Sequence, residues 1–179
     1  MSEMKKFVST GRGIFSIFLA SLVLIMIAFS GPVSAFTVLI GAPSSAKTDT
    51  VVNFNVSVDL STAEFVHVTG ITLDISGPSS GSGHPAFCDL PLSSDTFTGC
   101  IDKISGRSTN DVDVTSLQIP TLSPYGGPYG YGSAGGPTSF VYAVSWKTPN
   151  TPTTYLVTIK VFDGSNVLKT ESKTVDLTH

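Results

Sequence analysis

The chain has few charged residues, few histidines and few cysteines and methionines. Charged residues make up 13% of its 179 positions, and its only histidines, His67, His84 and His179, lie far apart in the sequence. A hydrolytic triad needs a nucleophile, a base and an orienting acid that meet in space, and no Gly-x-Ser-x-Gly elbow is present. No Cys-x-x-Cys-His occurs, and Cys100 lacks the His or Met neighbour of a blue-copper site. The sequence therefore predicts a protein that is not an enzyme and uses no cofactor.

Positive charge is also scarce beyond the N-terminal segment. From Phe36 onward, seven Lys and Arg stand against twelve Asp and Glu, a formal charge of 7 − 12 = −5. No basic cluster is available to follow a phosphate backbone, so nucleic acid is not an expected partner. Methionine is absent after Met26, whereas Ser, Thr and Val are plentiful. Thr and Val favour strands over helices, and the hydroxyls provide a solvated surface.

The first 35 residues have the order of a secretory signal peptide. A basic stretch (Lys5, Lys6 and Arg12) precedes a 16-residue apolar run over 14–29, and residues 31–35 end in a small-x-small pattern at Ala35. This order predicts a signal peptide over residues 1–35 and a mature chain that is secreted or held at the cell surface.

Two alternatives for this segment remain open. The apolar run is shorter than the roughly 20 residues that span a bilayer, and Pro32 interrupts a helix, but the segment could be kept as an N-terminal anchor. Only then would the membrane be a partner. Arg12-Gly13 before an apolar helix also resembles the start of archaeal type IV pilins and archaellins, although Gly31-Pro32 departs from that pattern.

Cys88 and Cys100 are the only cysteines. In an exported chain such a pair predicts a disulfide. Closing this 13-residue loop would stabilise the fold by up to roughly 3 kcal/mol. Because His84 lies four residues before Cys88, metal binding is an alternative, as is a reactive thiol.

Alternating apolar and polar residues predict strands through most of the chain after Ala35. In the clearest segment, Val52, Phe54, Val56 and Val58 share one face. The third segment changes phase at Gly70, which predicts a β-bulge there. Strands are expected at 36–41, 50–60, 65–76, 112–119, 140–146, 155–161 and 167–177, with short pieces at 87–92 and 100–104.

No segment after residue 35 keeps a 3.6-residue period. The sequence 163–166, Asp-Gly-Ser-Asn, predicts a tight hairpin turn, and the Gly-, Pro- and Tyr-rich stretch 120–137 predicts a long loop. Residues 36–179 are therefore expected to form one all-β domain with two packed sheets.

The sequence Tyr155-Leu-Val-Thr-Ile-Lys-Val-Phe-Asp-Gly-Ser-Asn-Val, followed by a Thr-rich strand, resembles the last hairpin of immunoglobulin-like domains. Polycystic-kidney-disease repeats, fibronectin type III domains and early-set domains share this hairpin. The resemblance covers about 40 residues and implies an antiparallel sandwich of about seven strands, with Tyr155 in a tyrosine corner. The Cys-Trp-Cys spacing and the Trp-Asp-Phe-Gly-Asp-Gly signature are both missing.

Two short motifs are candidate sites outside this hairpin. Asn110, Asp111 and Asp113 offer oxygen ligands for Ca²⁺, but no Gly-containing calcium loop surrounds them, which favours a turn with solvated carboxylates. Asn55-Val56-Ser57 is an N-glycosylation sequon on the polar face of its strand.

Three tyrosines, Tyr125, Tyr129 and Tyr131, lie close together in the 120–137 loop. Exposed rings on a loop can stack on sugars or bury against a protein, since each ring offers a large contact area at a low entropic cost. The alternative is that the rings lie back on the sandwich.

Together these features predict a non-catalytic extracytoplasmic module of a cell surface or matrix that binds a surface protein or glycan. One alternative is a subunit of an extracellular filament that self-associates through a retained helix or by strand addition. Another is an accessory subunit of an exported enzyme or electron-transfer complex.

Overall fold

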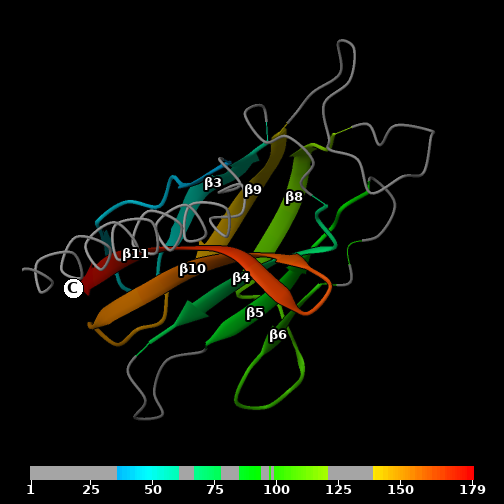
Figure 1. Ribbon diagram of the computed structural model, residues 1–179. Helices are drawn as coiled ribbons and strands as arrows, with labels where there is room; N and C mark the ends of the chain where they lie inside the picture. Colours follow the sequence, from blue (N-terminus) through cyan, green and yellow to red (C-terminus); the bar gives the residue numbers. More distant parts are fainter. Residues whose placement is uncertain (1–35, 61–66, 78–84, 94–96, 98, 121–138) are drawn as a thin grey trace, which may run out of the picture. The chain divides into compact units, whose positions relative to one another are not determined.

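The computed structural model describes residues 36–60, 67–77, 85–93, 97, 99–120 and 139–179 (Figure 1). The predicted signal peptide (1–35), His84 and nearly all of the predicted 120–137 loop lie outside these residues. Of the described part, 66% is strand and none is helix. It therefore also contains no helix long and apolar enough to span a bilayer.

The first sheet has four antiparallel strands. Each strand alternates apolar and polar residues, so one face is buried and the other is open to solvent. Its strands, in spatial order, are β1 (Thr37–Ile40), β3 (Val51–Asp59), β9 (Ser139–Lys147) and β8 (Val112–Gln118).

The second sheet has seven strands among the described residues. All neighbours are antiparallel except β2 and β11, which run parallel. Its order is β2 (Ser45–Lys47), β11 (Asn166–Thr178), β10 (Thr154–Asp163), β4 (Gly70–Ser76), β5 (Ala86–Leu90), β6 (Cys100–Asp102) and β7 (Ser108–Thr109).

The strand order is that of an immunoglobulin-like sandwich, in which strands ABED form one sheet and GFC the other. Taken in chain order, β1, β3, β4, β8, β9, β10 and β11 occupy the positions of strands A to G. These are the seven strands that the sequence predicts. The four short strands β2, β5, β6 and β7 extend the second sheet. The prediction of an all-β immunoglobulin-like sandwich is thus confirmed.

The core lies between the two sheets. Its largest fully buried side chains are Trp146, Tyr142, Tyr155 and Phe140. The rings of Trp146 (β9) and Tyr155 (β10) pack across the two sheets with centroids 5.3 Å apart. As predicted, Tyr155, Val157, Ile159 and Val161 form the buried face of β10.

The predicted bulge at Gly70 is wrong. Gly70 is the first residue of β4, which pairs in regular register with β10 as far as Ser76. The change of phase arises because Val68 is buried from an irregular segment before the strand. The register shift in this sheet lies instead between Val161 and Phe162, where β10 pairs with β11.

One end of the sandwich, here called the loop end, is where β3, β5, β8 and β10 finish and β1, β4, β9 and β11 begin. The registers within each sheet define it, for example Asp59 beside Ser139 and Gly70 beside Phe162. Contacts between the sheets align the two halves of this end. Lys169 Nζ on β11, for instance, donates a hydrogen bond to the Phe36 carbonyl beside β1 at 2.7 Å.

Candidate binding surface at the loop end

The topology brings two candidate binding loops to the same end of the sandwich. Segment 121–138 connects β8 to β9, and segment 91–99 connects β5 to β6. Because β5 and β8 finish at the loop end, both segments leave and rejoin the described part there. Tyr125, Tyr129 and Tyr131 themselves lie outside the described residues.

The base of the 121–138 segment is fixed by side chains that sequence analysis does not single out. Gln118 Nε2 donates a hydrogen bond to the Ser139 carbonyl at 3.0 Å, which joins the two residues that flank this base. Ser139 Oγ lies 3.1 Å from Asp59 Oδ1 and donates to it, which joins β9 to β3. Pro120, the last described residue before the segment, is buried. Both points of attachment are therefore ordered.

The base of the 91–99 segment is fixed by the Cys88–Cys100 disulfide. The two cysteines lie directly opposite each other on β5 and β6, with Cα atoms 4.3 Å apart, and both are buried. Gly99 precedes Cys100 with φ of +87°, a conformation that favours glycine. The disulfide prediction is confirmed, and the metal and free-thiol alternatives are wrong. A disulfide of this kind points to an oxidising environment.

A buried hydrogen bond places the two loop bases side by side. Tyr142 Oη on β9 donates to the Pro91 carbonyl at 2.8 Å, across the two sheets. Pro91 is the residue that follows β5, and Tyr142 lies near the start of β9. The described residues at the bases of the two segments are thus neighbours at the loop end.

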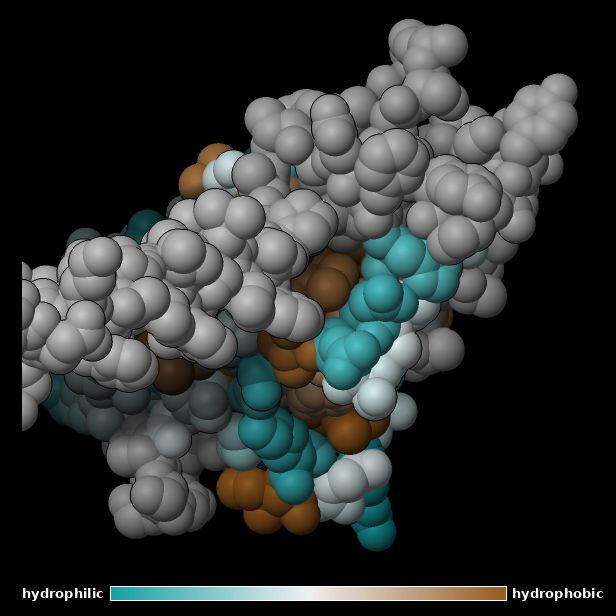
Figure 2. Space-filling view, in the orientation of Figure 1, coloured by the Kyte–Doolittle hydropathy of each residue, from teal (hydrophilic) through white to brown (hydrophobic). Residues whose placement is uncertain are grey.

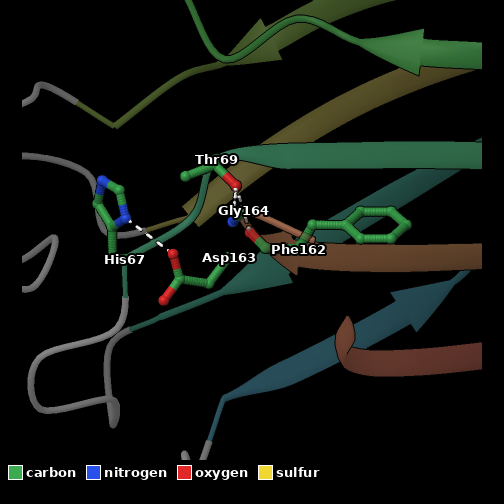
Figure 3. A network of polar contacts seen from close by, with 5 residues as sticks. All are labelled: His67, Thr69, Phe162, Asp163 and Gly164. Atoms are coloured by element: carbon green, nitrogen blue, oxygen red, sulfur yellow. Dashed lines mark hydrogen bonds and ion pairs between the residues drawn. The ribbon is translucent and has the colours of Figure 1, made fainter. Parts of the chain in front are cut away.

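A polar network at the loop end ties the start of β4 to the β10–β11 hairpin (Figure 3). His67 Nδ1 lies 3.0 Å from Asp163 Oδ1, and the backbone N–H of Gly164 donates to Thr69 Oγ1 at 2.6 Å. Thr69 also donates from its backbone N–H (2.8 Å) and its hydroxyl (3.3 Å) to the Phe162 carbonyl. Gly164 has φ of +58° in the two-residue turn, which confirms the predicted hairpin.

This network can position backbone and recognise polar groups, but it is not arranged as a triad. The Thr69 hydroxyl is directed to backbone groups of the hairpin and not to His67. The side chains of His67 and Asp163 are 51% and 45% exposed, so both can reach a ligand. Figure 2 shows hydrophilic and hydrophobic residues interspersed over the described strands on one face.

The calcium candidates do not form a shared site. The Asp111 carboxylate accepts a hydrogen bond from Thr109 Oγ1 at 3.2 Å, and the Asp111 N–H donates to the same hydroxyl at 3.1 Å. Asn110 is exposed in this turn, whereas Asp113 lies on β8 with its side chain on the outer face. No three His, Cys, Asp or Glu side chains gather to hold a metal within the described residues. The turn interpretation explains Asn110 and Asp111, whereas Asp113 is a solvated side chain of β8.

Tyr155 does not form a tyrosine corner within the described residues. Its hydroxyl is buried and has no hydrogen-bond partner in the part of the chain that the structure describes. The ring packs instead against Gly77 at the end of β4, where a Cβ would lie 2.8 Å from its Cε1. Burial raises the pKa of the Tyr155 phenol above the ordinary value of 10.0.

Comparisons with known proteins show no family for this chain. No family model matches the sequence, and no curated protein matches it. Among solved structures, astrotactin-2, a vertebrate perforin-like membrane protein, is 16% identical with a TM-score of 0.38 over 79% of this chain and 20% of its own. A family 123 glycoside hydrolase from Clostridium perfringens is 14% identical (TM-score 0.34; 74% of this chain, 21% of its own).

A chain from a structure described as the structural basis of T cell specificity and activation by the bacterial superantigen toxic shock syndrome toxin-1 is 12% identical, with a TM-score of 0.38 over 79% of this chain and all of its own. The chain spans about a fifth of the length of the first two structures. At these levels of similarity, none of the three carries an argument about function.

Proposed function

We propose that this protein is an exported recognition module of a cell surface or extracellular matrix that binds a protein or glycan through the loop end. One observation carries the proposal: the strand order brings the described bases of the 91–99 and 121–138 segments to one end of the sandwich, where the Cys88–Cys100 disulfide and the Tyr142–Pro91 hydrogen bond fix them. Rigid strands that present neighbouring loops are the arrangement that immunoglobulin variable domains use for recognition.

The composition of the 121–138 segment supports this proposal. Tyr125, Tyr129 and Tyr131 are interspersed with Gly and Pro, a combination of large rings and small residues that is typical of binding loops. Phe97 in the neighbouring segment is 39% exposed and adds a fourth ring. Aromatic rings of this kind bind the apolar faces of sugars and the side chains of protein partners.

The location and the finer family assignment belong to the same proposal. The buried disulfide supports export, and we infer that residues 1–35 act as a signal peptide that is removed before Phe36. Among immunoglobulin-like domains, an early-set or polycystic-kidney-disease type is favoured over the antibody type. The disulfide joins β5 and β6 here, whereas in antibody domains it joins strands B and F, which correspond to β3 and β10.

Strand addition is disfavoured along most of β11. Lys169, Glu171 and Lys173 lie directly opposite Val161, Ile159 and Val157 of β10, so they share the inward face of the sheet. Inward-pointing charges on a strand near an edge oppose pairing with another chain, because a new strand would bury them. Recognition through loops is therefore better supported than assembly at this strand.

The test compares the protein with a variant that carries Tyr125→Ser, Tyr129→Ser and Tyr131→Ser. Both are applied to a glycan array and to intact cells of the source organism. We expect the variant to lose binding and to keep its melting temperature. The matched control is Leu156→Ser, which removes an apolar side chain on the outer face of β10 in the seven-stranded sheet. This side chain is 40% exposed, and the control variant should bind normally. A clear loss of stability in the triple variant would show that the rings pack on the sandwich instead.

A further inference from the structure

Asn55 lies in the middle of the outer face of the four-stranded sheet, away from the loop end. It is exposed, and it is the fifth of nine residues in β3. We propose that Asn55 is an N-glycosylation site and that the glycan is attached before β3 pairs with its neighbours. This proposal rests on the export inferred above, but it does not depend on binding at the loop end.

The geometry of the sequon fits an accessible acceptor. Asn55 and Ser57 are two residues apart in a strand, so both side chains lie on the outer face, while Val56 between them is fully buried. The Asn55 side chain makes no hydrogen bond to other described residues, so its amide is available.

The residues beside Asn55 leave room for a sugar. Its direct neighbour on β9 is Ala143, and on the other side the Gly41 N–H donates to the Asn55 carbonyl at 2.8 Å. Ala143 carries only a methyl group and Gly41 only a hydrogen atom, the two smallest side chains. A sugar on Asn55 can therefore lie along the sheet without displacing a neighbour.

The reaction is a glycosyl transfer from a lipid-linked oligosaccharyl phosphate donor. The Asn55 side-chain nitrogen attacks the anomeric carbon of the donor sugar, and a bond forms between this nitrogen and that carbon. The bond from the anomeric carbon to the phosphate oxygen breaks, and the lipid phosphate leaves. The nitrogen loses one proton, which the leaving phosphate or solvent accepts. A separate membrane-bound oligosaccharyltransferase must catalyse this step.

The structure also assigns an order to modification and folding. Around Asn55, β3 is paired on both sides, with β1 from Ile40 beside Val56 and with β9 across its whole length. A transferase must hold the acceptor segment in its own active site. That hold competes with the backbone hydrogen bonds of the central strand. Transfer therefore precedes the closure of the first sheet.

The glycan would shield apolar side chains on this face. Three of them are large and well exposed: Leu39 (61%), Val51 (59%) and Leu117 (58%). A bulky, hydrated glycan near them covers apolar surface that would otherwise favour self-association.

The test is peptide mass spectrometry on protein purified from its own cells. We expect the peptide that contains Asn55 to carry a glycan in the wild type, and to lose it completely in Asn55→Gln and in Ser57→Ala. The matched control Asn53→Gln changes an exposed amide on the same face of β3 that is not in a sequon, and it should keep the glycan. An unmodified Asn55 peptide in the wild-type protein would overturn the proposal.

The order of events is tested in vitro with membranes that contain the transferase and its lipid-linked donor. A synthetic peptide of residues 50–60 should be modified, whereas folded protein produced without the glycan should not. Equal modification of the two would refute transfer before folding, and it would leave the site itself to be decided by the first experiment.

Discussion

Tyr142 and Tyr155 are both fully buried in the core, but only one of them forms a hydrogen bond through its hydroxyl among the described residues. Tyr142 donates to the Pro91 carbonyl at 2.8 Å, whereas the Tyr155 hydroxyl has no partner. Replacing each tyrosine by phenylalanine removes one oxygen atom and leaves the ring in place. The two substitutions should therefore change stability in opposite directions.

The magnitudes follow from the cost of an unpaired buried polar group. Tyr142→Phe leaves the Pro91 carbonyl without its donor and should lower the free energy of unfolding by about 1–3 kcal/mol. Tyr155→Phe removes a hydroxyl that has lost its water without gaining a partner, so it should raise this free energy by roughly 1 kcal/mol. For a domain of this size, each kcal/mol moves the melting temperature by about 2–4 °C.

The pH dependence of stability gives a second readout of the same pair. Burial raises the pKa of Tyr155 in the folded state above the value of 10.0 that it has when unfolded. Above that value the unfolded chain releases the phenolic proton more readily than the folded one. The contribution of this pKa difference to the free energy of unfolding is therefore fully present below about pH 10. It is lost as pH rises through the folded-state pKa. Tyr155→Phe should reduce this alkaline loss.

The assay is urea unfolding of the protein and the two variants, followed by circular dichroism at neutral pH and again between pH 9 and 11. A Tyr155→Phe variant less stable than the wild type by 1 kcal/mol or more would refute the reasoning, because it would mean that the hydroxyl has a stabilising partner. A Tyr142→Phe variant of unchanged stability would show that the bond to Pro91 contributes nothing.

Three further predictions concern other parts of the sandwich. Gly77→Ala should lower the free energy of unfolding by about 1–3 kcal/mol, measured by thermal unfolding. The added Cβ would lie 2.8 Å from Cε1 and 2.9 Å from Cζ of Tyr155. A neutral effect would mean that the ring moves freely. Replacing both Cys88 and Cys100 by Ala should cost up to about 3 kcal/mol in urea unfolding, and an unchanged midpoint would contradict the predicted stabilisation by loop closure. Replacing Glu171 and Lys173 by Val should produce oligomers visible in light scattering, whereas a strictly monomeric variant would show that these charges do not guard the strand.

The sequence by itself determined the fold class and most of the strands. Strict alternation in segments such as 51–59 and 139–147 fixes which side chains face the core, because a shift by one residue would expose every apolar side chain. The disulfide was also predictable, because the only two cysteines of a chain that begins with a signal-peptide pattern are expected to pair with each other. The short strands β2 and β7 were missed, because two or three residues carry no detectable period.

Only the tertiary structure decided which distant residues meet. The hydrogen bond from Tyr142 to Pro91 spans 51 positions, and the His67–Asp163 pair spans 96, so no local pattern reveals them. The phase change at Gly70 has two local explanations, a bulge or a strand start, and only the pairing with β10 distinguishes them. Likewise, the chain order does not show that segments 91–99 and 121–138 share one end. That follows from the direction of each strand, which pairing between remote segments fixes.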